Sequence, residues 1–272
     1  MFPGLRPGSR LNDWLLRTLK RVADGQVQRW VKPIYDLRAG LGLPRGGNPV
    51  FEGQFSPFGT LALYSRVLGA PQPDWPPHVT QTGCVFYNAP DGLGRELEAF
   101  LAAGPPPLVF TLGTSAVGAA GRFYHESAAA AIRLGMRAVL LTGGIAENQP
   151  DFPLPDSVLL VDRAPHQQLF PHAVAIVHQC GAGTLGQALR AGKPMLCVPH
   201  AHDQHDNAFR LTKLGVARTL RPREYTAARV AQELKAVLEA RYRERAEDVA
   251  AIVREEGGAA AAAAAIEAVI SS

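Results

Sequence analysis

The chain has 272 residues, of which 47% are hydrophobic and 19% charged, and its formal net charge is +4. This length and apolar content predict a soluble globular protein of one or two domains. The charge is mild and the arginines are spread along the chain, which argues against a nucleic-acid partner. No apolar run approaches the roughly 20 residues of a membrane span, so we expect at most peripheral membrane contact.

The start of the sequence and its cysteines indicate the compartment. Early helix breakers such as Pro3 and Gly4 interrupt any signal-peptide pattern. Cys84, Cys180 and Cys197 form no CxxC pair and no even set, which is typical of a reducing compartment without disulfides. We therefore predict a cytoplasmic protein.

The first third of the chain predicts one long helix and two short strands. Apolar residues at helical spacing with basic residues between them predict an amphipathic surface helix over 11–38, which Pro33 is expected to end or kink. Apolar runs within 59–68 and 80–87 predict short strands, and the prolines between them predict a stiff extended connector.

A linker rich in glycine over 88–94 places the main boundary between residues 1–88 and a second domain of residues 89–272. Beyond it, strands and helices alternate, which predicts an α/β fold with a parallel sheet and helices on both faces. The expected strands are 108–112, 138–141, 158–161, 173–177, 195–198 and 217–220, with a helix over 122–134 and terminal helices over 227–250 and 252–270.

A glycine turn follows the expected strand over 173–177. Gly181 and Gly183 come at once, and Thr184 is expected to cap a helix that ends at Ala191. A helix that begins directly after a strand presents unpaired N–H groups and a positive dipole end, and glycine lets an anion approach this backbone closely. This turn therefore predicts a phosphate site, with a purely structural turn as the alternative.

Two further polar clusters follow strands. Gly113, Thr114 and Ser115 end the first regular strand, and Asp203 and Gln204 lie in the loop after the strand over 195–198. Because the carboxyl ends of parallel strands meet at one edge of the sheet, we expect these clusters to face one crevice together with the glycine turn.

Several other chemistries find little support. The dinucleotide motif GxGxxG is absent after the first regular strand, and no GxSxG turn predicts a hydrolase. His200, His202 and His205 could suggest a metal site, but they fall in one loop without a second cluster, so we predict no metal. His178 and Gln179, at the tip of the strand before the glycine turn, are better candidates for contact with an anion.

Together these segments resemble the donor-binding half of GT-B glycosyltransferases of the UDP-glycosyltransferase family. The signature is VHQCGAGTLGQALRAGKP followed by VPHAHDQHDNAFRLTKLGVAR, where the family has a His pair, a Gly-rich turn and a loop ending in Asp-Gln. PLVFTLGTSA and RAPHQQLFPHA match two further family segments, and PQPDWPPHVTQTG resembles the chain crossing between domains. The resemblance covers about residues 64–220 and is closest to the bacterial rhamnosyltransferases of glycolipid synthesis.

The resemblance implies a Rossmann-like GT-B C-terminal domain and assigns a part of the donor to each cluster. The donor diphosphate would be held by Gly113, Thr114, Ser115, His178, Gln179, Gly181, Ala182, Gly183 and Thr184. The nucleoside would lie at Pro165, His166 and Gln187, and the sugar at Asp203 and Gln204. No cofactor is implied, because the nucleotide sugar is itself a substrate.

Two departures from the family pattern have consequences. Gln179 stands where the family has its second histidine, and an amide cannot carry charge, so stabilisation of the leaving diphosphate should be weaker. The family also carries a catalytic histidine early in its acceptor domain, whereas the first histidine here is His78. Residues 1–88 therefore resemble a remnant of the acceptor domain, and no catalytic residue is assigned.

These observations predict an inverting, metal-independent hexosyltransferase that moves a sugar from a UDP- or dTDP-sugar donor to a hydroxyl of a lipophilic acceptor. Its acceptor domain would belong to a longer protein or to a separate chain. A non-catalytic module that binds a nucleotide sugar is the alternative, and Gln179 motivates it. A nucleotide-sugar epimerase shares the architecture but needs acid and base groups from both domains, and the Asp-Gln loop favours the transferase.

Overall fold

The computed structural model describes residues 10–51, 55–114 and 116–271. Within these residues, no helix combines the length and the apolar character that crossing a membrane requires. The cytoplasmic location stays a prediction.

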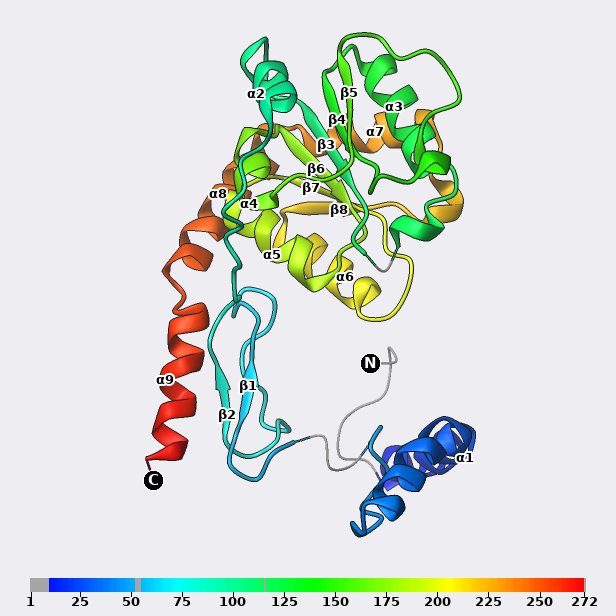
Figure 1. Cartoon of the computed structure of the whole chain (residues 1–272), viewed down its shortest axis with the longest axis vertical. Coiled ribbons are helices and arrows are strands. Elements are labelled where there is room, and N and C mark those ends of the chain that lie inside the picture. The colour runs from blue at the N-terminus through cyan, green and yellow to red at the C-terminus, as the bar shows by residue number, and fades with distance from the viewer. Residues whose placement is uncertain (1–9, 52–54, 115, 272) are drawn as a thin grey trace. The chain divides into compact units, whose positions relative to one another are not determined.

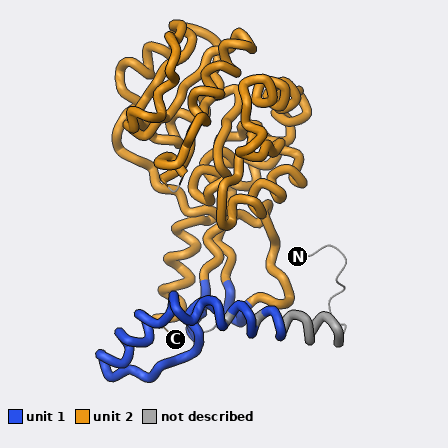
Figure 2. The backbone as a smooth tube through the Cα atoms, turned by 90° about the vertical axis from the view of Figure 1, so that its right-hand side faces the viewer, with its two compact units in different colours: residues 1–60, 76–79 blue, residues 61–75, 80–272 orange. Residues whose placement is uncertain are grey.

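The chain divides into two compact units, coloured separately in Figure 2. One unit comprises residues 1–60 and 76–79, and the other comprises residues 61–75 and 80–272. The predicted boundary at residue 88 concerns the family's acceptor and donor domains and stays a prediction.

The first unit contains the long helix α1, Arg10–Gly40. Of the two predicted effects of Pro33, an end or a kink, the end is wrong, because α1 continues through the proline to Gly40. Lys32 and Asp36 form an i,i+4 ion pair of 2.6 Å across this turn. Proline cannot donate a backbone hydrogen bond within the helix, and the ion pair offsets part of that loss.

Strands β1, Thr60–Ala62, and β2, Val79–Gln81, form a two-stranded sheet. Both are shorter than the runs expected over 59–68 and 80–87. β2 ends just before Gly83, whose φ of +87° lies outside the extended conformation of a strand.

The second unit is built on a six-stranded sheet in the order β5-β4-β3-β6-β7-β8, and every pair of neighbours is parallel (Figure 1). This confirms the predicted α/β class. The strands are β3 (Leu108–Thr111), β4 (Ala138–Leu141), β5 (Val158–Val161), β6 (Ala175–His178), β7 (Met195–Cys197) and β8 (Ala217–Thr219).

Both faces of this sheet are covered by helices, as the buried strands require. Leu108 and Phe110 of β3 pack towards α3 and α7, whereas Val109 packs towards α2, α4, α5, α6 and α8. The helices are α2 (Arg95–Ala102), α3 (Phe123–Leu134), α4 (His166–Leu169), α5 (Ala182–Ala191), α6 (Gln204–Leu214), α7 (Ala227–Val237), α8 (Ala240–Glu255) and α9 (Gly258–Ile270), with 3₁₀ turns at Val117–Ala119, Ala146–Asn148, Phe170–His172 and Pro222–Glu224.

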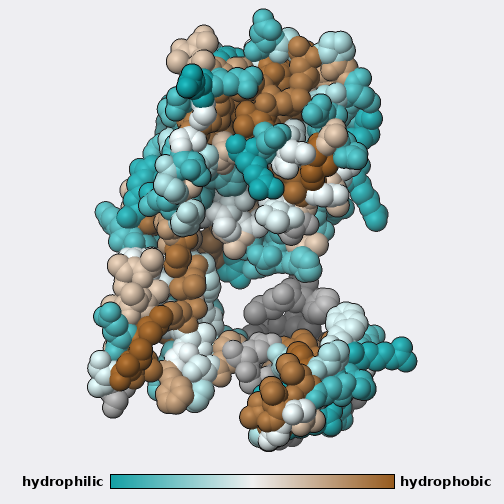
Figure 3. All heavy atoms as spheres, in the orientation of Figure 1, coloured by the Kyte–Doolittle hydropathy of each residue, from teal (hydrophilic) through white to brown (hydrophobic). Residues whose placement is uncertain are grey.

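The C-terminal region contains three helices where the sequence predicts two. α8 ends at Glu255. The next residue, Glu256, has an extended backbone, and its carboxylate accepts hydrogen bonds of 2.9 Å from Ser65 Oγ and the Arg66 N–H. α9 then begins after Gly257 and carries exposed apolar side chains at Ile266, Val269 and Ile270. Brown, apolar atoms gather over the C-terminal helix in Figure 3.

Candidate functional site

The strand order reverses between β3 and β6, which lie side by side although β4 and β5 come between them in sequence. In open parallel sheets, ligands bind at the carboxyl ends of the strands that flank such a switch point. Phe110 pairs with Val177, so the two strands end at the same level. The turns that begin at Gly113 and Gly181 therefore both open onto the crevice at this edge.

The side chain of Gln179 lies between these two turns. A Cβ on Gly113 would overlap Nε2 of Gln179, and a Cβ on Gly181 would lie 3.1 Å from the same atom. Thr184 Oγ1 is 3.7 Å from the same position on Gly113. Gln179 is 2% exposed, and its Oε1 has no hydrogen-bond partner among the described residues. Gly113, Gln179, Gly181 and Thr184 thus form one cluster, as the resemblance implies.

Helix α5 begins at Ala182, so the prediction that Thr184 caps it is wrong. Gly181 takes the capping position with an extended backbone and no side-chain hydrogen bond, which lets the helix begin at the next residue. Thr184 is 8% exposed and lies inside the first turn. Ala182 and Gly183 are exposed, so the first N–H groups of α5 are left for an anion.

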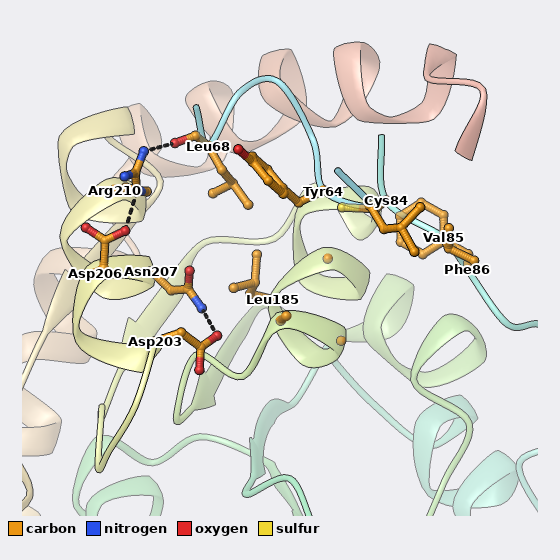
Figure 4. A pocket seen from close by; sticks show the side chains of 14 residues that line it. Tyr64, Leu68, Cys84, Val85, Phe86, Leu185, Asp203, Asp206, Asn207 and Arg210 are labelled. Atoms are coloured by element: carbon orange, nitrogen blue, oxygen red, sulfur yellow. Dashed lines mark hydrogen bonds and ion pairs between the residues drawn. The ribbon is translucent and has the colours of Figure 1, made fainter. Parts of the chain in front are cut away.

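The loop that carries Asp203 faces the same crevice as the glycine turn. Ala182, Gly183 and Asp203 line one cavity of about 450 Å³ (Figure 4). Asn207 Nδ2 donates to the Asp203 carboxylate at 2.8 Å and to the Cys180 carbonyl at 2.9 Å. This amide ties the Asp203 loop to the glycine turn and confirms that the two polar clusters meet at one edge.

Gln204 shapes this loop from inside. It is 3% exposed, and its Oε1 accepts the N–H groups of His200 at 2.8 Å and Ala201 at 3.1 Å. Its side-chain carbonyl is therefore used within the protein. Its contact with a sugar stays a prediction.

His178 is buried and neutral. Burial, and secondarily the neighbouring His166, lower the pKa of His178 to about 3, and burial lowers the pKa of His166 to about 4. Nδ1 of His178 accepts the Cys180 N–H at 3.1 Å, so the imidazole orients the backbone of the turn. With 0% exposure it offers no charge to the crevice, and its direct contact with a diphosphate stays a prediction.

The residues expected to bind the nucleoside lie at two places. Pro165 precedes α4, and the His166 ring stacks on Phe170 with centroids 4.4 Å apart. Gln187 lines a second cavity of about 580 Å³ together with Arg190, and it does not line the cavity beside Asp203.

The turn after β3 carries the remaining predicted phosphate ligands. Thr114 is exposed there, whereas Ser115 lies outside the described residues.

One wall of the Asp203 cavity was not predicted from the sequence. Tyr64 and Phe86 line it together with Leu68 (Figure 4). Arg210 closes its side by binding the Asp206 carboxylate at 2.6 Å and the Leu68 carbonyl at 2.7 Å. The i,i+4 spacing of Asp206 and Arg210 could have predicted their ion pair from the sequence. Tyr64 and Phe86 lie on either side of the proline connector, and only the fold brings them to the wall of this cavity.

Comparison with known proteins identifies this architecture. Residues 141–269 match the family described as erythromycin biosynthesis protein CIII-like, C-terminal domain. This part of the chain is similar to the C-terminal domain of that family. The match confirms the predicted resemblance to the C-terminal half of nucleotide-sugar glycosyltransferases, and relatives of this chain are named glycosyltransferases.

One such relative is the O-mycaminosyltylonolide 6-deoxyallosyltransferase of Streptomyces fradiae, which is 32% identical over 236 residues. These residues cover 79% of this chain and 52% of the relative, so this chain spans about half of that protein.

Two solved structures show the same fold as this chain. The glycotransferase of kitacinnamycin matches with a TM-score of 0.75 and 22% identity, covering 93% of this chain and 66% of that one. Spinosyn rhamnosyltransferase SpnG, complexed with thymidine diphosphate, matches with a TM-score of 0.65 and 20% identity, covering 85% and 69%. Both confirm the α/β architecture.

Proposed function

We propose that this chain is the donor-binding half of a hexosyltransferase that uses a UDP- or dTDP-sugar. One observation carries the proposal: two glycine turns meet at the switch point of the sheet, beside an uncapped helix N-terminus and the Asp203 carboxylate. The thymidine diphosphate in the structure of SpnG supports this class of donor.

The proposed reaction inverts the anomeric centre and needs no metal. An acceptor hydroxyl attacks the anomeric carbon, the bond to the diphosphate breaks, and negative charge grows on the leaving group. The N–H groups of Ala182 and Gly183 at the start of α5 are preorganised to stabilise that charge. The base that takes the hydroxyl proton is proposed to come from an acceptor domain, within a longer protein or on a separate chain.

The proposed acceptor is lipophilic. Apolar side chains line the side of the cavity opposite Asp203, and Leu68, Tyr64 and Phe86 supply most of that wall. An apolar acceptor would gain by leaving water there, while Asp203 holds the sugar hydroxyls.

A non-catalytic nucleotide-sugar-binding module is a second candidate, because the neutral amide of Gln179 occupies the space between the two turns. Supplying the acceptor domain of a related transferase in trans, with donor and acceptor, distinguishes the two. Glycosylated product would exclude the non-catalytic module.

Asp203 is expected to recognise the sugar and not the nucleotide. Asp203→Ala should weaken binding of a nucleotide sugar by about 10- to 100-fold, the effect of losing a charged hydrogen bond, and leave binding of UDP or dTDP unchanged. Titration calorimetry with both kinds of ligand checks this. Asp206→Ala is the matched control, because Asp206 lines the same cavity but binds Arg210. Equal weakening of nucleotide and nucleotide sugar by Asp203→Ala would disprove the sugar assignment.

A further inference from the structure

Three buried side chains with metal-binding atoms meet beneath the glycine turn. The ligand atoms of His178, Cys180 and Cys197 all lie within 4.8 Å of one another, and each residue is 0% exposed. His178 and Cys197 are register partners on the parallel strands β6 and β7, so their side chains leave the sheet on the same face. Cys180 follows two residues later. The cluster is therefore fixed by strand pairing and by the turn together.

The backbone of Cys180 adopts an unusual conformation for a side-chain-bearing residue. Its φ is +68°, in the left-handed region that favours glycine and costs other residues on the order of 1 kcal/mol. Its N–H donates to His178 Nδ1, and its carbonyl accepts Asn207 Nδ2, so the backbone is held from both sides. A glycine would avoid this cost. A cysteine at position 180 instead places a thiol beside the thiol of Cys197 and the imidazole of His178.

We propose that His178, Cys180 and Cys197 bind one thiophilic metal ion of the zinc type, through two thiolate sulfurs and one imidazole nitrogen. Two thiolates and one neutral imidazole neutralise a divalent ion, so the complex carries no net charge into the buried site. Binding releases the two thiol protons and changes no oxidation state. Three protein ligands leave one tetrahedral position for a further donor.

The present arrangement needs only a small contraction. A tetrahedral site with bonds of about 2.0–2.3 Å separates its ligand atoms by roughly 3.5–3.8 Å, against at most 4.8 Å here. Nδ1 of His178 has the available lone pair, because it now accepts the Cys180 N–H. A metal at Nδ1 leaves the ring proton on Nε2 and displaces the Cys180 N–H from that nitrogen.

The site lies next to the exposed start of α5. Cys180 leads directly into Gly181, and the next residues, Ala182 and Gly183, are exposed. A metal held here would join the ends of β6 and β7 directly below the turn. It should therefore stabilise the folded chain by mass action, independently of any transferase activity.

The test is a titration of the reduced full-length chain with Co²⁺ and with Zn²⁺ in competition with a chromophoric chelator. One equivalent of Co²⁺ should give thiolate-to-cobalt charge-transfer absorption and the intense visible bands of tetrahedral cobalt. Zn²⁺ should displace it and raise the melting temperature. Cys180→Gly suits the backbone at φ +68° and should fold. Each of the variants Cys180→Gly and Cys197→Ala should bind the metal at least about 100-fold more weakly. Even the loss of a residue that only orients a metal ligand can cost that much affinity.

Cys84→Ala is the matched control, because Cys84 is the remaining cysteine, is also buried and lies outside the cluster. It should keep full metal affinity. Three results would each overturn the proposal: no stoichiometric binding by the unmodified chain, binding without thiolate charge transfer, or equal binding by the folded Cys180→Gly and Cys197→Ala variants. The second result would point instead to exposed histidines such as His202 and His205.

Discussion

Replacing Gly183 with aspartate is expected to abolish nucleotide diphosphate binding while leaving the fold intact. A Cβ added at Gly183 meets no heavy atom within 4 Å, and a carboxylate in the first turn of a helix stabilises it by about 0.3–1 kcal/mol. The same carboxylate would repel the diphosphate proposed to bind there. Two like charges about 4 Å apart interact by about 4 kcal/mol at an effective dielectric constant of 20, so affinity should fall at least about 100-fold.

The measurement is titration calorimetry with UDP and dTDP, paired with denaturant unfolding of the same variant. Gly183→Asn is the matched control, because it adds a side chain of the same size without charge and should cost much less affinity. If Gly183→Asp bound the nucleotide as tightly as the unmodified chain, the diphosphate would not lie at the start of α5.

Acid is expected to destabilise the fold through His178. Its pKa lies near 3 in the folded chain, because burial and His166 disfavour the charged ring, and near 6.5 in the unfolded chain. The unfolded state therefore binds one proton more between these values. The stability associated with neutral His178 is complete above pH 6.5 and is lost as the pH falls towards 3, amounting to about 3 kcal/mol by pH 4.

Denaturant unfolding from pH 7 to pH 4, compared between the unmodified chain and His178→Asn, isolates this contribution. The asparagine retains an acceptor for the Cys180 N–H but cannot titrate, so its unfolding free energy should fall less steeply. Val177→Ala serves as the control, because it removes buried apolar volume from the same strand and should lower stability equally at every pH. Identical slopes for His178→Asn and the unmodified chain would show that His178 titrates alike in both states.

The sheet could be predicted from the sequence because its strands are short apolar runs bounded by glycine and proline. The strands over 138–141 and 158–161 match the prediction to the residue, and the others differ by one or two residues at an end. The glycine turn and Asp203 were expected to share a crevice, since strand ends of a parallel sheet meet at one edge, and they line one cavity.

What the sequence could not reveal depends on side-chain packing and strand register. The pairing of His178 with Cys197 joins residues 19 positions apart, so the buried cluster with Cys180 has no signature in the spacing. Thr184 does not cap helix α5, because the helix begins at Ala182 and Gly181 occupies the N-cap position without a side-chain hydrogen bond. The nucleoside-binding role of Gln187 was predicted from the resemblance alone, and in the structure Gln187 lines a separate cavity.

Calorimetric titration of the unmodified chain with UDP and with dTDP tests most directly whether its C-terminal domain is a donor site. Saturable binding of one nucleotide per chain, with a preference for one base, is the predicted result and would name the donor class. No saturable binding of either nucleotide, by a chain that unfolds cooperatively, would contradict a working donor site at the two glycine turns.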